Sequence, residues 1–127
     1  MITLDSHEDK QSYARQQLSR AGLSGVVTFR LGDARESLAA LDESVDFVLL
    51  DLWKHLYVPC FDLFYPKLSR GALVVADNMI FPETTQPSAA LYRQHVRAKA
   101  GIQSMLLPVG SGLEISRCVR GLDPVTV

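Results

Sequence analysis

Oxygen-bearing side chains follow two apolar segments of this sequence, at the points where turn or helix residues begin. Asp51 ends the run VDFVLLD, and Asp77 with Asn78 ends the run GALVVADN. In an open parallel sheet, ligands bind outside the carboxyl ends of the strands, so these side chains are candidates for one site. Carboxylate and amide oxygens are suitable ligands for a hard divalent cation. The sequence therefore predicts a cation held by Asp51, Asp77 and Asn78.

Two residues close to Asp51 extend this candidate site. Lys54 follows Asp51 by three residues. In a dry pocket beside a divalent ion the ammonium form of a lysine is disfavoured, so its pKa falls and the side chain can act as a general base. A plain ion pair with Asp51 is the alternative. Trp53 is either a core aromatic residue or a flat face for a purine or a substrate.

Two further carboxylates follow apolar segments nearer the N-terminus. Asp5 ends MITLD, at a position where an acid in nucleoside-binding folds accepts hydrogen bonds from a ribose diol. A helix cap is the alternative for Asp5. Asp33 could accept a hydrogen bond from an adenine amino group, or it could cap a helix that begins at Ala34. Taken alone, the residues favour the cap for Asp33.

Strand and helix signals alternate along the chain. Strands are expected over residues 1–5, 26–33, 45–51 and 71–78, then as a pair around the turn at 110–112, and helices over 6–22, 34–42, 57–71 and 88–99. The apolar runs at 45–51 and 71–78 are typical of strands covered on both faces. The tight Gly-Ser-Gly turn favours an antiparallel hairpin. The pattern predicts an α/β three-layer sandwich with a mostly parallel sheet.

Length and composition set broad limits on the protein class. The 127 residues predict one domain over 1–127, and the apolar fraction of 47% allows a real core. The net charge of −1 argues against nucleic acid held by bulk electrostatics. Cys60 and Cys118 lie in apolar segments and are expected to be buried thiols. Without a signal peptide or an apolar run of transmembrane length, we expect a cytoplasmic protein with no membrane partner.

Other α/β site types find less support. No G-x-G-x-x-G follows a strand and opens a helix, which argues against a dinucleotide-binding dehydrogenase. No G-x-S-x-G elbow indicates a serine hydrolase. A phosphoacceptor receiver domain also uses an acidic pocket with a lysine, but its acid pair is expected at the first strand, and Trp53 stays unexplained.

Together, the segments ITLD, GDAR, LLDLWKHLY and VVADNMIFP resemble the second half of a catechol O-methyltransferase-type enzyme. The most specific part is D-x-W-K-x-x-Y, which ends at Tyr57, followed at the next strand end by A-D-N-x-I-x-P. The resemblance implies a class I, S-adenosylmethionine-dependent O-methyltransferase with a Rossmann-like fold. Such enzymes use magnesium and methylate one hydroxyl of a small catechol-like or phenolic acceptor.

The resemblance also implies a role for each matched residue. The metal ligands would be Asp51, Asp77 and Asn78, the proton acceptor Lys54, the cofactor contacts Asp5, Asp33, Ala34 and Trp53, and the residue at the substrate mouth Pro82.

Two features depart from the family pattern. The family's glycine-rich strand-turn-helix should precede Met1, so we expect an N-terminally truncated domain without its first strand and cofactor loop. Some catechol enzymes carry a glutamate before the final hairpin that contacts the second hydroxyl of the substrate. The corresponding stretch around Met105 has no acidic residue, which argues against catechol itself as the acceptor.

The absent strand would lie between strands 1–5 and 45–51, and its loss would expose unpaired edges. A fragment of a longer product, direct pairing of those two strands, and a second chain filling the gap are the alternatives. The alternative function is a catalytically incompetent module serving in interaction or homodimerisation.

Overall fold

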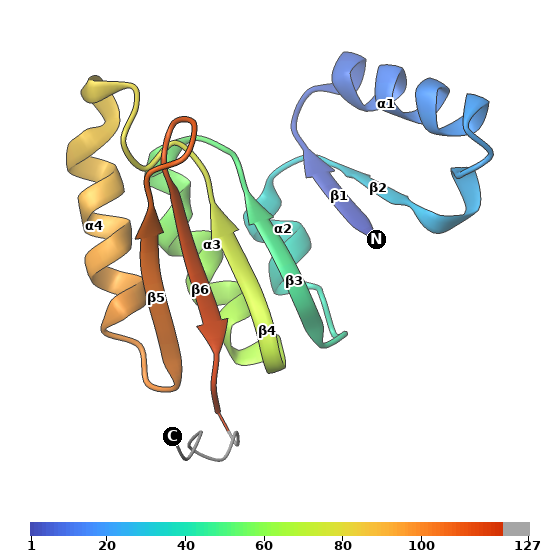
Figure 1. The fold of residues 1–127 in the computed structure, drawn as a ribbon. Coiled ribbons are helices and arrows are strands. Elements are labelled where there is room, and N and C mark those ends of the chain that lie inside the picture. Colours follow the sequence, from blue (N-terminus) through green and yellow to red (C-terminus); the bar gives the residue numbers. More distant parts are fainter. Residues whose placement is uncertain (121–127) are drawn as a thin grey trace. The chain divides into compact units, whose positions relative to one another are not determined.

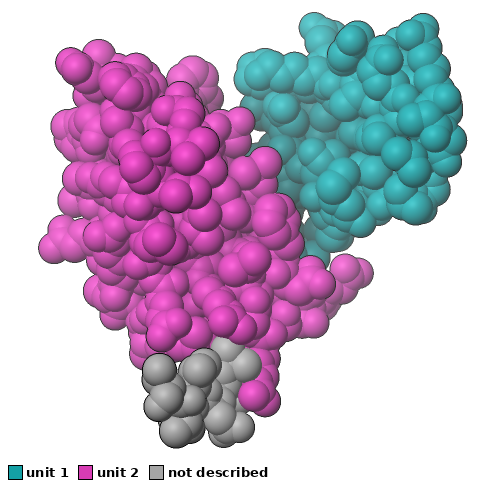
Figure 2. All heavy atoms as spheres, viewed as in Figure 1, with its two compact units in different colours: residues 1–41 teal, residues 42–127 magenta. Residues whose placement is uncertain are grey.

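The computed structural model describes residues 1–120, which divide after residue 41 into two compact units. Figure 2 shows the two units in different colours. The strands form two sheets, one of two strands and one of four. Each unit therefore contains its own sheet with its own helices.

The first unit combines a two-stranded parallel sheet with two helices. Its strand β1 (Ile2–Asp5) pairs with β2 (Thr28–Leu31), and its helices are α1 (Glu8–Arg20) and α2 (Ala34–Ala39). The start and stop signals of α1 are confirmed, because Glu8 and Asp9 lie in its first turn and Gly22 follows its end with a φ of 73°. Strand β2 is shorter than predicted, because residues 24–26 form a 3₁₀ turn.

The second unit contains the four-stranded sheet, in the order β3-β4-β6-β5 (Figure 1). The strands are β3 (Val45–Leu50), β4 (Leu68–Ala76), β5 (Ile102–Leu107) and β6 (Leu113–Cys118). Strands β3 and β4 are parallel, and β6 runs antiparallel to both β4 and β5. The predicted C-terminal hairpin is therefore confirmed.

Two helices of this unit differ from their predicted bounds. Helix α3 (Tyr57–Phe64) ends earlier than predicted, because Pro66 lies in a 3₁₀ turn, and β4 then begins three residues before Gly71. Helix α4 (Gln86–Arg97) begins two residues before Ser88 and has a proline in its first turn. Proline is tolerated there because a backbone N–H in the first turn has no intrahelical hydrogen bond to lose.

The core of the second unit lies between one face of the sheet and these two helices. Tyr57 and Phe61 of α3 and Tyr92 of α4 are fully buried, and their rings make edge-to-face contacts with centroids 5.4 and 6.1 Å apart. The side chains of Cys60 and Cys118 are buried, as predicted.

The opposite face of the same sheet carries apolar side chains that stay accessible. Phe47 and Leu49 of β3 are 57% and 61% exposed, and Met105 of β5 is 59% exposed. Within the second unit, α3 and α4 pack on one face of the sheet only, so the predicted cover on both faces of the strand at 45–51 is not provided by this unit.

A buried polar network joins α4 to the hairpin. Glu114 of β6 is fully buried, and its carboxylate accepts bonds from the Arg97 guanidinium at 2.8 and 3.0 Å. The Ser104 hydroxyl donates to the same carboxylate at 2.6 Å and lies 2.7 Å from the Ser116 hydroxyl. A buried charge is tolerated when it is paired and hydrogen-bonded in this way.

None of the helices within residues 1–120 has the length and apolar character that a membrane crossing requires.

Candidate functional site

Strands β3 and β4 end side by side at the candidate site. Leu50 and Ala76 are the last paired residues of the two parallel strands, and Asp51 and Asp77 follow them directly. The Asp77 backbone N–H donates to the Leu50 carbonyl oxygen at 3.0 Å, which extends the pairing by one residue. The structure thus brings the two carboxylates to the same end of neighbouring strands.

A tight turn follows β4 at Asn78. This residue has a φ of 57°, a left-handed conformation that asparagine tolerates better than most residues, and its backbone N–H donates to Asp77 Oδ1 at 2.6 Å. Within residues 1–120, neither the Asn78 side-chain amide nor the Asp51 carboxylate has a hydrogen-bond partner. Their oxygen atoms are therefore available to a ligand.

The environment of Asp51 differs from the one predicted. Asp51 ends a segment predicted to be a strand covered on both faces, but its side chain is exposed, and Asp77 is half-buried. Water can solvate an exposed carboxylate, so burial alone does not force a partner on Asp51.

Lys54 opens the short 3₁₀ turn η2 (Lys54–Leu56), directly before α3. Its ammonium group forms no ion pair with a described residue and instead donates to the Tyr57 hydroxyl at 2.6 Å. Burial lowers the pKa of Lys54, and the charges of Asp51 and Asp77 oppose this only in part. The simple ion pair with Asp51 is therefore not what the structure has.

Tyr57 connects these elements, although the sequence analysis gave it no role beyond its place in the D-x-W-K-x-x-Y pattern. Its side chain is fully buried, and its hydroxyl lies 3.1 Å from the Leu50 carbonyl oxygen and 3.2 Å from that of Asp77. Burial raises the pKa of Tyr57, so the phenol keeps its proton. The three-residue spacing from Lys54 was the only sequence signal for this contact.

An open hollow of about 440 Å³ lies beside Lys54 and brings four predicted residues together. It is lined by Leu52, Trp53, Lys54, His55, Asn78, Pro82, Thr84, Thr85 and Ser88. Trp53 is 71% exposed, so its alternative as a core aromatic residue is wrong. His55, Thr85 and Ser88 also line the hollow, and no motif in the sequence marks them.

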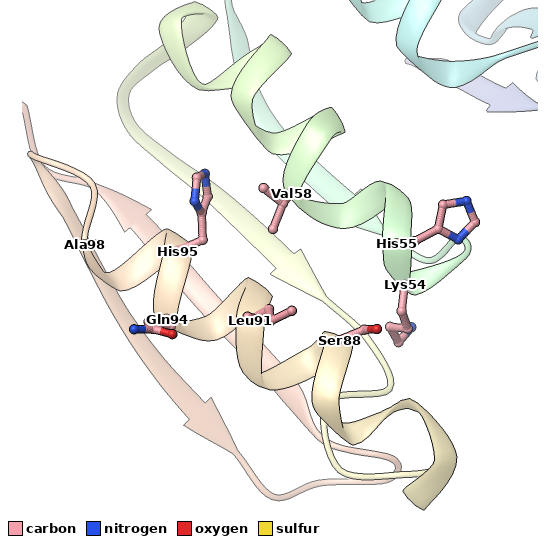
Figure 3. Close-up of a pocket in the computed structure, with 8 residues that line it drawn as sticks. All are labelled: Lys54, His55, Val58, Ser88, Leu91, Gln94, His95 and Ala98. Carbon is pink, nitrogen blue, oxygen red and sulfur yellow. The ribbon is translucent and has the colours of Figure 1, made fainter.

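A second hollow of about 640 Å³ continues from the first, between α3 and α4 (Figure 3). It shares Lys54, His55 and Ser88 with the first hollow, and Val58 and Leu91 add apolar surface. The two hollows share Lys54 as a lining residue, so this side chain is accessible from both.

In the first unit, Asp5 stands at the end of β1. One carboxylate oxygen accepts a bond from the His7 backbone N–H at 2.9 Å, and the other has no partner within residues 1–120. Burial raises the pKa of Asp5, but hydrogen bonds from His7 outweigh it and the net shift is downward. His7 occupies the N-cap position of α1 without a side-chain cap bond, and Asp5 accepts from the backbone N–H of His7, so Asp5 is not the N-cap residue of α1.

Asp33 caps α2, as the residues alone had favoured. Its Oδ1 accepts the Arg35 backbone N–H at 2.8 Å, and the Arg35 guanidinium donates to both carboxylate oxygens at 2.5–3.1 Å. These bonds lower the pKa of Asp33 to about 2. Ala34 is the first residue of α2, where backbone N–H groups lack an intrahelical acceptor.

This cap predicts a pH dependence for the first unit. Because the pKa of Asp33 is lower in the folded state, its stabilisation is complete above about pH 4 and is lost as the pH falls through about 2. We expect Asp33→Asn to reduce the drop in melting temperature between about pH 5 and pH 2. Thermal unfolding followed by circular dichroism measures this drop. The control Asp46→Asn removes a carboxylate that has no hydrogen bond to any of residues 1–120, and an equal effect of both variants contradicts the assignment.

Comparison with known proteins places the chain in a family. The model of a methyltransferase domain matches residues 1–79. The chain belongs to this methyltransferase family. Catechol O-methyltransferase of Bos taurus is 28% identical over 132 residues, covering 98% of this chain and 46% of that protein. The Sus scrofa enzyme is 29% identical, covering 97% of this chain and 66% of that protein. The predicted resemblance to the catechol O-methyltransferase type is confirmed.

Solved structures of methyltransferases share the fold. An O-methyltransferase from Bacillus cereus in complex with SAH has a TM-score of 0.82 at 21% identity, over 92% of this chain and 61% of that one. The O-methyltransferase TomG from Streptomyces achromogenes in complex with SAM has a TM-score of 0.83 at 19% identity, over 93% and 61%. The predicted Rossmann-like α/β fold is confirmed, and the chain spans about three fifths of these structures.

The matched range of the methyltransferase family includes the first unit and the first part of the second unit. It contains every predicted site residue except Pro82, which lies three positions beyond its end. The family match therefore covers the strand ends that carry Asp51 and Asp77 as well as the first unit.

Proposed function

We propose that this chain is the catalytic part of a magnesium-dependent O-methyltransferase that methylates a hydroxyl of a small catechol-like or phenolic acceptor, with S-adenosylmethionine as methyl donor. The observation that carries the proposal is the group of Asp51, Lys54, Asp77 and Asn78 at the ends of β3 and β4. The family match and the SAM- and SAH-bound structures with the same fold support methyl transfer.

The donor set suits magnesium in its chemistry. No three histidine, cysteine or carboxylate side chains gather as a metal site within residues 1–120, so the Asn78 amide is required as the third protein ligand beside Asp51 and Asp77. A site of two carboxylates and one amide is all oxygen, as a hard cation prefers. When bound, the ion supplies Lewis-acid stabilisation of an ionised acceptor hydroxyl.

Lys54 moves the proton in this proposal. Its nitrogen accepts the proton of the acceptor hydroxyl as that O–H bond breaks, and the oxygen becomes a nucleophile. The lowered pKa of Lys54 favours the neutral amine that this step needs. S-adenosylmethionine supplies the methyl group, which the acceptor oxygen takes as the carbon–sulfur bond breaks. Positioning of the two reactants accounts for much of the rate in such transfers.

The residues proposed to contact the cofactor or the acceptor differ in how freely they can do so. Asp5 keeps one free carboxylate oxygen, which suits a ribose diol. Both oxygens of Asp33 are already bonded to Arg35, so a bond to adenine needs Arg35 to share or release it. The exposed Trp53 ring offers a flat face to a purine or an acceptor, and Pro82 stands at the rim of the same hollow.

Asp77→Ala tests the metal set. We expect calorimetric titration with magnesium to show binding by the unmodified chain and none by the variant, because one of two charged ligands is lost. Asp46→Ala, which removes a carboxylate from β3 away from its carboxyl end, is the matched control. Unchanged magnesium affinity in Asp77→Ala refutes the assignment.

The whole activity is tested on the same folded chain. Incubation with S-adenosylmethionine, magnesium and either catechol or a monophenol is expected to give a methylated product. Absence of product together with absence of heat on cofactor titration favours the non-catalytic interaction module instead. Dimerisation and a cytoplasmic location remain predictions.

A further inference from the structure

The Tyr57 hydroxyl contacts both strand ends and Lys54. It lies within hydrogen-bond distance of the carbonyl of Leu50, which precedes Asp51, of the carbonyl of Asp77, and of Lys54 Nζ. Lys54 Nζ also lies 4.1 Å from the centre of the Tyr57 ring. The buried Tyr57 oxygen thus contacts the two strand ends that carry the candidate metal ligands and also contacts the candidate base.

Donor and acceptor counting fixes the direction of these bonds. A phenol has one proton to donate and can accept through its oxygen lone pairs. Carbonyl oxygens only accept, so the Tyr57 proton is shared between Leu50 and Asp77. Lys54 therefore meets the lone pairs of Tyr57 and must donate to them, whether its nitrogen is charged or neutral. In the neutral amine, the nitrogen lone pair stays unengaged by Tyr57.

We propose that Tyr57 is a positioning residue, whose hydroxyl holds the Lys54 nitrogen at the ends of β3 and β4 with its lone pair free to take a proton. The catalytic consequence of this role rests on the proposed function, but the contact itself does not. A lysine side chain has four rotatable bonds and loses conformational entropy when it is held in one place, so a fixed acceptor is an effective way to order it.

Tyr92 provides an internal comparison for this hydroxyl. It is fully buried like Tyr57, and the two rings lie at 89° to each other with centroids 5.4 Å apart. Its hydroxyl, however, has no hydrogen-bond partner within residues 1–120. Tyr92→Phe therefore removes a buried hydroxyl from the same core without removing a contact to Lys54, and it is the matched control for Tyr57→Phe.

The test follows the Lys54 side chain by nuclear magnetic resonance on the full chain with ¹³C-labelled lysine. The Lys54 Cε signal is assigned by its disappearance in Lys54→Arg. In the unmodified chain we expect Lys54 Cε to have the high transverse relaxation rate of an ordered side chain. In Tyr57→Phe we expect this rate to fall by about twofold, towards the rate of the exposed Lys10. Tyr92→Phe is expected to leave the rate unchanged.

Two outcomes overturn the proposal. An unchanged Lys54 rate in Tyr57→Phe shows that the hydroxyl does not hold the amine, and an equal fall in Tyr92→Phe shows a general loss of packing. If Tyr57→Phe does not fold, the unmodified chain decides: a nuclear Overhauser contact between the Lys54 ε-protons and the Tyr57 ring supports the proposal, and its absence refutes it. Ordered Lys54 in a chain that forms no methylated product refutes the proposed function but leaves this positioning role intact.

Discussion

Replacing Lys54 by methionine is expected to lower kcat for methyl transfer by about 10²–10⁴-fold, the usual contribution of a general base. Methionine keeps most of the apolar length of the side chain but cannot accept a proton. The dissociation constant for S-adenosylmethionine is expected to stay within about twofold, because Lys54 acts on the acceptor hydroxyl and not on the donor. Steady-state kinetics and calorimetry on the same samples measure the two quantities.

The control for this variant is Lys10→Met, which removes a lysine charge from an exposed position on α1. Its kcat is expected to match that of the unmodified chain. Parallel losses of kcat and cofactor affinity in Lys54→Met would assign Lys54 a structural role and contradict its role as base.

Arg97→Met is expected to destabilise the second unit by about 3–5 kcal/mol, because it leaves a buried carboxylate without its counter-charge. Glu114 is completely buried, and after the change the Ser104 hydroxyl would be its one remaining donor among residues 1–120. Arg97 itself is half exposed, so little apolar packing is lost with it. Urea denaturation measures the loss as a lower midpoint at an unchanged slope.

Two variants separate this charge effect from a general loss on α4. Arg93→Met changes an arginine one turn earlier that forms no ion pair within residues 1–120, and it is expected to shift stability by less than about 0.5 kcal/mol. Adding Glu114→Gln to Arg97→Met removes the stranded charge and is expected to recover most of the loss. If the double variant is no more stable than Arg97→Met, the buried charge is not the cause.

Much of the site could be predicted from local sequence. Residues that end apolar runs must lie at strand ends, and parallel strands place those ends on the same edge of a sheet, so Asp51 and Asp77 were predictable as neighbours. The Gly-Ser-Gly turn set the final hairpin, and the spacing of Asp33 from the next helix favoured its cap. These features depend on backbone conformations that a few adjacent residues decide.

Other features were settled only by packing between distant segments. The apolar segment that contains Phe47 and Leu49 predicted a strand covered on both faces, but both side chains are exposed. A run of apolar residues does not tell whether a helix covers the second face. Pairing of Glu114 with Arg97 needed α4 to lie against β6, and the contact of Tyr57 with Leu50, Asp77 and Lys54 needed two strand ends and a helix start to converge. The sequence by itself thus determined which residues end each strand and what chemistry they carry. Only the tertiary structure decided which of them are buried and which atoms they meet, because burial and hydrogen bonding depend on segments far apart in the chain.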